Sequence, residues 1–147
     1  MGEDLFELGY IPAAVALIAV CVAVYTDMRW RIIPNKLNYP LIAGGVLFYV
    51  FWGLYRGDVL LLISGAMGAA IAFAISYAMW VTGGWAGGDV KLLTALGALL
   101  PMFSPPHVPA PYSSSYPFFS VTILLNSVIA ATPVVLVYAI ICWLSLI

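Results

Sequence analysis

The stretch Gly83-Gly84-Trp85-Ala86-Gly87-Gly88-Asp89-Val90-Lys91 is a glycine-rich turn that ends in an acid and leads into an apolar run. Glycine adopts positive φ angles and lets another backbone approach closely, as a site that admits a second chain requires. Asp is also favoured at the N-cap and in the first turn of a helix. Asp89 can therefore be interpreted either as a helix cap or as one member of a functional site. The rest of the chain decides between these interpretations.

The composition is that of an integral membrane protein. Of 147 residues, 65% are hydrophobic and only 7% are charged, against roughly a quarter charged in soluble domains. The mean hydropathy is +1.10. Five basic and six acidic residues form no polybasic surface, so no nucleic-acid partner is expected. Cys21 and Cys142 have no Cys or His neighbours at ligand spacing, so we expect no metal, redox centre or cofactor.

The apolar runs predict an all-α fold, a polytopic transmembrane bundle of about five spans in a single domain over residues 1–147. A helix needs about 20 residues to cross the bilayer core. The expected helices are residues 8–26, 37–55, 59–82, 89–103 and 118–147. The fourth is short for a full crossing. The fifth contains Pro133 and is interpreted as one tilted, kinked helix, with two half-helices as the alternative.

The distribution of basic residues predicts the orientation. The bases in the loops after the first and third helices are Arg29, Arg31, Lys36 and Lys91. Cytoplasmic loops carry the excess of Lys and Arg, so these loops are expected in the cytoplasm and the acidic N-terminus outside. Asp27, at the end of the first helix, then lies at the same membrane depth and on the same side as Asp89. A capping role for Asp89 explains neither the shared depth nor the shared side.

Two carboxylates at one edge of a membrane form a candidate catalytic pair. Like charges a few Å apart disfavour ionisation of both groups, so such a pair keeps one proton. The ionised group can take a proton from water while the protonated group donates to a peptide carbonyl, which gives hydrolysis without a metal or a covalent intermediate. The proton belongs to the pair, so acid and base are not assigned separately.

Two motifs carry a resemblance to a known family. Asp27 is followed by Ile33-Pro34-Asn35, and Gly88-Asp89-Val90-Lys91-Leu92-Leu93 comes downstream. Over about residues 13–100 the chain resembles the type IV prepilin peptidases and archaeal preflagellin peptidases, which are membrane aspartyl proteases of the Gly-x-Gly-Asp type. The resemblance implies that Asp27 and Asp89 are the two catalytic aspartates.

The active-site turn departs from the family pattern at one position. Gly88 matches the glycine immediately before the second aspartate. Ala86 stands where the family has its first glycine, and Gly87 occupies the variable position. A small residue is kept, so we expect the geometry of the turn to survive.

The neighbouring polar residues are candidate contacts to a substrate loop. They are Arg29, Arg31, Pro34, Asn35 and Lys91. Each has a structural alternative. The two arginines suit membrane-interface anchors, Pro34-Asn35 suits a turn, and Lys91 suits a lysine that snorkels to the interface. On a helix Lys91 points well round from Asp89 and need not touch it.

The resemblance also implies an activity and a location. Family members cut a short, positively charged cytoplasmic leader, a class III signal peptide, from pilin-like or archaellin precursors, just before the hydrophobic segment. The chain is therefore expected in the cell membrane with its active site towards the cytoplasm. The methyltransferase portion of many bacterial members, with its paired cysteines, is not expected. The segment Tyr116-Pro117-Phe118-Phe119-Ser120 resembles archaeal members and favours an archaeal origin.

Several other features are assigned structural roles. Small residues recur at i and i+4 from Ser64 to Ala74, which predicts a closely packed, central third helix. His107 lies in the Pro-rich loop 104–117, on the opposite side from both acids, and is not expected to act in catalysis. Asn126 is expected to hydrogen-bond between helices. The chain ends in an apolar run, which leaves open whether further helices follow.

Three other functions remain open from the sequence. A presenilin-like or signal-peptide-peptidase-like protease would carry Tyr before the first acid and a later Pro-Ala-Leu motif, whereas Thr26 precedes Asp27 and that motif is absent. A small ion-coupled transporter would place its acids near the bilayer midplane and show inverted repeats. An assembly scaffold would use the acids only to cap and orient helices.

Overall fold

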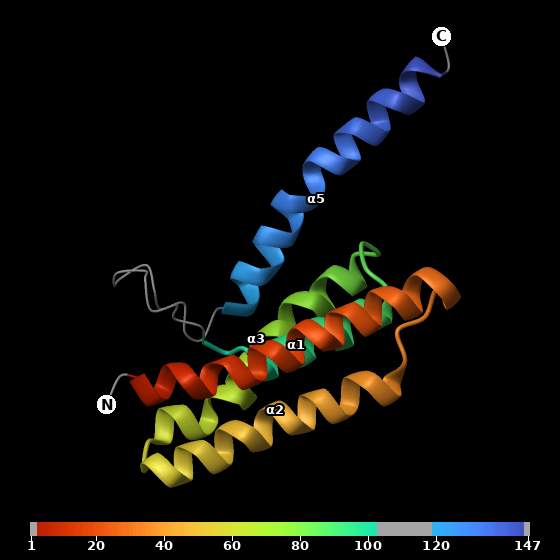
Figure 1. The fold of residues 1–147 in the computed structure, drawn as a ribbon. Coiled ribbons are helices and arrows are strands. Elements are labelled where there is room, and N and C mark those ends of the chain that lie inside the picture. The colour runs from red at the N-terminus through yellow and green to blue at the C-terminus, as the bar shows by residue number, and fades with distance from the viewer. Residues whose placement is uncertain (1–2, 103–118, 146–147) are drawn as a thin grey trace.

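The structure, a computed structural model, describes residues 3–102 and 119–145, with side chains from Tyr10 onward. The loop 104–117 and its His107 lie outside the described residues. The helices are α1 Glu3–Trp30, α2 Asn35–Arg56, α3 Val59–Val81, α4 Gly87–Leu99 and α5 Phe119–Leu144. Figure 1 shows α1 to α4 gathered into one bundle, whereas α5 projects away from it. The predicted all-α architecture is confirmed, and α5 is one continuous helix rather than two halves.

The end of α1 differs from the expected one. This helix continues to Trp30, past the predicted end at residue 26, so Asp27 lies in the last helical turn and not at the start of a loop. Nothing between these residues disfavours a helix. The first breaker is Pro34, which also disfavours helical backbone at the residue before it. Asp27 is therefore held on a helical backbone.

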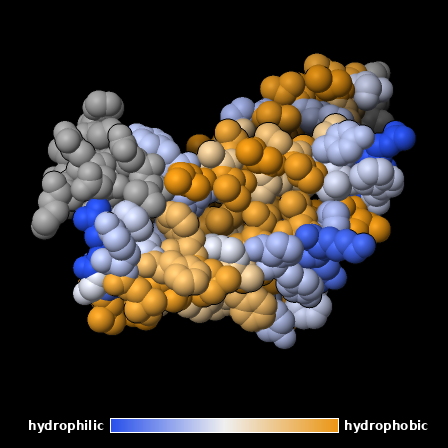
Figure 2. Space-filling view, turned by 60° about the horizontal axis from the view of Figure 1, so that its bottom comes forward, coloured by the Kyte–Doolittle hydropathy of each residue, from blue (hydrophilic) through white to orange (hydrophobic). Residues whose placement is uncertain are grey.

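Four of the described helices are long and apolar enough to cross a membrane: Tyr10–Trp30 within α1, and α2, α3 and α5. Figure 2 shows hydrophilic residues gathered at two opposite ends of the molecule, with hydrophobic residues in the band between them. A bundle that spans a bilayer needs such an apolar band between polar ends. The chain is therefore a multi-pass membrane protein.

α4 is the short helix expected from the sequence. Its 13 residues extend about 20 Å, against about 30 Å of hydrocarbon in a bilayer. It begins at Gly87, two residues before Asp89, and every residue from 93 to 99 is buried. α4 therefore lies enclosed within the bundle and reaches only part of the membrane depth.

Small residues form the faces on which the helices pack. α2, α3 and α4 pack closely on one another, and α1 contacts chiefly α4. The buried small residues are Ser64, Gly65, Gly68, Ala69, Ala72 and Ser76 on α3, and Ala16, Ala19, Ala23 and Thr26 on α1. Small side chains let backbones approach closely in lipid. The small-residue face of the third helix is thus confirmed, although the central position belongs to α4.

Glycines mark the closest crossings. A Cβ on Gly97 of α4 would collide with the carbonyl oxygen of Gly68 and the side chain of Ala72 on α3. A Cβ on Gly45 of α2 would lie 2.7 Å from the carbonyl carbon of Ala98 on α4. Side chains at these positions would force the helices apart, so the two glycines set how deeply α4 is enclosed.

Gly44 and Gly45 give a matched test of this packing. Gly45→Ala is expected to destabilise the fold by about 1–3 kcal/mol, because its methyl group meets the backbone of Ala98. Gly44 is exposed, with no heavy atom within 4 Å of an added Cβ, so Gly44→Ala should stabilise α2 by up to about 1 kcal/mol. Thermal unfolding in detergent, followed by circular dichroism, measures both effects. Equal midpoints for the two variants would contradict the packing of α2 on α4.

Candidate active site

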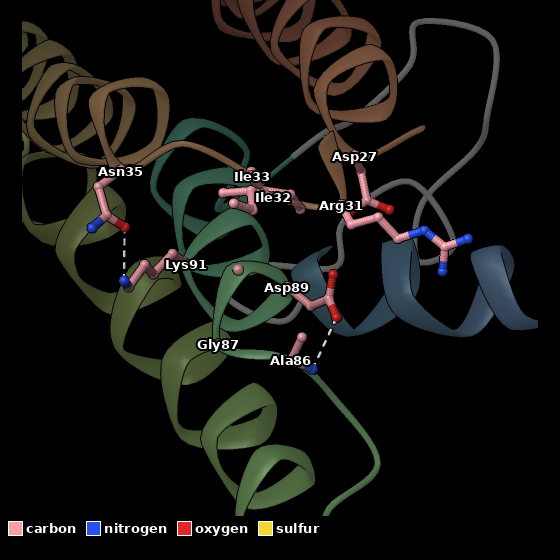
Figure 3. Close-up of a pocket in the computed structure, with 10 residues that line it drawn as sticks. Asp27, Arg31, Ile32, Ile33, Asn35, Ala86, Gly87, Asp89 and Lys91 are labelled. Carbon is pink, nitrogen blue, oxygen red and sulfur yellow. Dashed lines mark hydrogen bonds between the residues drawn. The ribbon is translucent and has the colours of Figure 1, made fainter. Parts of the chain in front are cut away.

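The end of α1 and the beginning of α4 lie at the same end of the bundle (Figure 1). A pocket of about 490 Å³ lies between them. The pocket is lined by Asp27, Arg31, Ile32, Ile33, Asn35, Ala86, Gly87, Gly88, Asp89 and Lys91. Figure 3 shows the side chains of Asp27, from α1, and Asp89, from α4, reaching into it from two sides. One pocket therefore contains both acids that the sequence predicted to share a membrane depth.

Asp27 is exposed in the last turn of α1. Its carbonyl oxygen accepts a hydrogen bond of 2.8 Å from the backbone N–H of Arg31, which closes the helix end. Arg31 has a φ of 55°, the left-handed conformation found at many helix ends. This turn directs the chain across the pocket, so that residues 31–33 line it.

Asp89 is half-buried at the third position of α4. Its Oδ2 accepts a hydrogen bond of 3.1 Å from the backbone N–H of Ala86 (Figure 3). One oxygen of Asp89 therefore does cap the start of the helix. The same hydrogen bond holds the carboxylate in a position where it lines the pocket. Among the described residues, no other hydrogen bond or ion pair engages this carboxylate, so its second oxygen is available to water or a substrate.

The turn before α4 does not require glycine at position 86. Ala86 has φ −85° and ψ 156°, an extended conformation open to every L-residue. The positive φ in this stretch belongs to Gly83, at 80°. Alanine is therefore compatible with this turn, and within residues 83–91 the positive φ expected of the glycine run occurs at Gly83 alone.

Ile32 and Ile33 form an apolar wall of the pocket that the sequence did not reveal. A Cβ on Gly88 would lie 3.3 Å from the Cβ of Ile33, so this glycine lets the α1–α2 loop lie against α4. A contact between residues so distant in the chain leaves no local pattern. The available signal was two apolar residues inside an otherwise polar loop.

The residue after Asp89 lies close to α3. The hydroxyl oxygens of Ser76 on α3 and Thr94 on α4 lie 3.4 and 2.7 Å from the carbonyl oxygen of Val90, the residue after Asp89. Both hydroxyl-bearing residues are buried. The Ser76 hydroxyl donates at 2.6 Å to the carbonyl oxygen of Ala72 in its own helix, and Thr94 bonds to Val90 within α4, so α4 is held against α3 here by close packing of small residues.

Comparison with known proteins identifies the family. Residues 14–146, nearly the whole chain, match the type IV leader peptidase family. The chain belongs to this family. Prepilin peptidase EppA of Methanothermobacter thermautotrophicus is 40% identical over 131 residues, which cover 84% of this chain and 34% of that protein.

Two preflagellin peptidases are also similar to this member of the leader peptidase family. That of Methanococcus maripaludis is 37% identical over 97 residues, which cover 66% of this chain and 40% of the relative. The preflagellin peptidase of Methanococcus voltae is 30% identical over 123 residues, which cover 81% of this chain and 52% of the relative. The chain thus spans between a third and about half of the length of these relatives. The resemblance read from the two motifs is confirmed.

Of the five residues that the sequence suggested as substrate contacts, three line the pocket of this member of the leader peptidase family and two do not. Those that line the pocket are Arg31, Asn35 and Lys91, and those that do not are Arg29 and Pro34. Pro34 is the N-cap residue of α2, and its carbonyl oxygen accepts a 3.0 Å hydrogen bond from the N–H of Leu37, as expected of a turn. Lys91 donates a 2.7 Å hydrogen bond from Nζ to Oδ1 of Asn35.

Proposed function

We propose that this chain is an aspartic-type endopeptidase that removes the short leader peptide from pilin-like or archaellin precursors. The observation that carries the proposal is the pocket shared by Asp27 and Asp89 in a chain of the type IV leader peptidase family. The relatives named prepilin and preflagellin peptidases support this substrate class. The partners are then precursors with class III signal peptides, met within the bilayer that surrounds the enzyme.

The two carboxylates supply the chemistry through one shared proton. The ionised carboxylate takes a proton from water, and the water oxygen attacks the carbonyl carbon of the scissile peptide. The protonated carboxylate gives its proton to the carbonyl oxygen, so a neutral gem-diol forms. The carboxyl group that took the water proton then gives it to the amide nitrogen, while the other carboxylate takes a proton from a hydroxyl of the gem-diol, so the carbon–nitrogen bond breaks and the pair again holds one proton. The hydrogen bond from Ala86 keeps Asp89 in one orientation during these transfers.

The pocket suits a peptide segment at the membrane edge. Its volume of about 490 Å³ is within the range of pockets that bind small ligands. Ile32 and Ile33 offer an apolar wall to residues near the hydrophobic segment of a precursor, while the charged lining, two carboxylates with Arg31 and Lys91, offers partners to the polar groups of the leader. These features favour cleavage at the junction of leader and hydrophobic segment.

The basic residues at the pocket end support a cytoplasmic site with the N-terminus outside. Single cysteines test this orientation on a background of Cys21→Ala and Cys142→Ala. Met28 is 81% exposed near the pocket, and Tyr55 is 80% exposed at the opposite end of α2. In intact cells an impermeant maleimide is expected to label Tyr55→Cys, and to label Met28→Cys only after permeabilisation. The reverse pattern would contradict the proposed orientation.

Cleavage of a panel of pilin-like and archaellin precursors in membranes or detergent tests the function. The intact chain is expected to release a leader-sized fragment from at least one precursor, and the chain with both aspartates replaced by asparagine is expected to release none. Mass spectrometry of the product locates the cut relative to the hydrophobic segment. Equal cleavage by the intact and doubly substituted chains would contradict the two-acid mechanism.

A further inference from the structure

The helix that carries Asp27 is weakly tied to the rest of the bundle. α1 contacts chiefly α4 through small side chains and has few contacts with α2. The hydroxyl of Thr26, next to the acid, donates to the carbonyl oxygen of Ala23 in its own helix at 3.0 Å. Asp89, by contrast, lies on an enclosed helix. Contacts elsewhere are therefore needed to set the position of Asp27 relative to Asp89.

A short loop links Asp27 to the beginning of α2. At one end, the N–H of Arg31 donates to the carbonyl oxygen of Asp27 at 2.8 Å. At the other end, the carbonyl oxygen of Pro34 accepts from the N–H of Leu37 at 3.0 Å. Both ends of the loop are thus fixed to helices, so a displacement of the first turn of α2 is transmitted to Asp27.

Lys91 ties that first turn of α2 to the beginning of α4. Its Nζ lies 2.7 Å from Oδ1 of Asn35, the first residue of α2, and 5.6 Å from the ring centroid of Tyr39. Figure 3 shows the hydrogen bond on the side of the pocket away from the two carboxylates. The hydrogen bond is exposed to solvent, which weakens it, but its donor is charged and the ring adds a cation–π attraction, so the two contacts act together. Lys91 is two residues from Asp89, so the contact fixes α2 against the turn that carries this acid.

We propose that Lys91, Asn35 and Tyr39 form a latch that sets the separation of Asp27 and Asp89. Lys91 is then a positioning residue, which acts through Asn35 and the loop and not by contact with a substrate. The inference rests on the proposed function and assigns a different role to two of the candidate substrate contacts. A misplacement of about 1 Å in a catalytic constellation costs about 10²-fold in rate, so loss of the latch should appear in kcat.

Cleavage kinetics of the full chain test the latch. Asn35→Leu removes the acceptor and leaves the charge of Lys91 in place, and it is expected to lower kcat about 3- to 10-fold with little change in KM. Lys91→Met is expected to cause a similar loss, and the double variant should be no worse than either single one, because all three lack the same contact. Lys91→Arg keeps N–H donors and a ring contact and should recover much of kcat.

Lys36→Met is the matched control for the change of charge. Lys36 is exposed at the same end of the bundle but does not line the pocket, so its loss should leave kcat near that of the intact chain. A rise in KM with kcat unchanged for Asn35→Leu or Lys91→Met would overturn the latch in favour of substrate contact. Losses that multiply in the double variant would overturn it in favour of independent roles.

Cross-linking measures the same separation without activity. Asp27→Cys and Asp89→Cys are joined by a short bifunctional thiol reagent on the Cys21→Ala, Cys142→Ala background, and adding Asn35→Leu is expected to slow this reaction several-fold. An unchanged cross-linking rate would overturn the latch, and this result does not depend on which substrate the protein cleaves. If the intact chain cuts no precursor while Asn35→Leu still slows cross-linking, the latch stands and the proposed function fails.

Discussion

Asp27→Asn and Asp89→Asn are each expected to lower the kcat of precursor cleavage by about 10³-fold. Asparagine has the shape of aspartate but can neither take a proton from water nor share one with its neighbour. The amide oxygen of an asparagine at position 89 can still accept the hydrogen bond from Ala86, so the fold should persist. Single-turnover cleavage of a purified precursor measures the loss. Because the acids act as one unit, the double variant should be no slower than the worse single variant.

Asp58→Asn is the matched control for the loss of a carboxylate. Asp58 lies at the opposite end of the bundle, where its Oδ1 accepts hydrogen bonds of 2.9 and 3.2 Å from the N–H groups of Leu60 and Leu61 at the start of α3. Asparagine caps helices about as well as aspartate, so stability and cleavage should change little. A folded Asp27→Asn or Asp89→Asn variant that cleaves as fast as Asp58→Asn would remove that acid from the mechanism.

Gly97→Leu is expected to destabilise the bundle by about 3 kcal/mol or more, because overpacking by even a few atoms costs about 1–3 kcal/mol. The new side chain would meet the carbonyl oxygen of Gly68 and the side chain of Ala72, where the backbones of α3 and α4 leave no room. Thermal unfolding in detergent and the yield of monodisperse protein measure the effect.

Gly44→Leu is the matched control, because the same side chain is added where no heavy atom lies within 4 Å of the new Cβ. Its unfolding midpoint should stay near that of the intact chain. An unchanged midpoint for Gly97→Leu would show that α3 and α4 do not cross at this glycine.

The hydropathy of the chain and the distribution of its basic residues were enough to predict the fold and the shared position of the two acids. Hydropathy located the helices, and the clustering of bases placed Asp27 and Asp89 at one end, where the structure has both in one pocket. The predicted end of α1 at residue 26 is four residues too early, because an acid after an apolar run suggests a loop, although the first proline after Asp27 is Pro34. Polarity marks where a chain meets water and not where its helix ends.

Local sequence could not show which loop residues reach the pocket. Arg29 and Arg31 are equivalent by charge, but only Arg31 lies beyond the helix end, in a left-handed turn that brings it to the pocket wall. Ile33 lines the pocket because Gly88 leaves room for it, and Lys91 meets Asn35 because α2 and α4 begin at the same end. Each of these facts depends on a contact between helices distant in the chain.

The shortness of α4 also bears on biosynthesis. A helix of 13 residues that begins with Gly-Gly-Asp and contains Lys91 is too short and too polar to partition into lipid by itself. Its entry into the bilayer must be driven by packing on helices already there, above all on the small-residue face of α3. We expect α3 and α4 to insert together as a hairpin, with α3 retained near the insertion machinery until α4 has left the ribosome. Asp89 would then reach the pocket only when that hairpin closes.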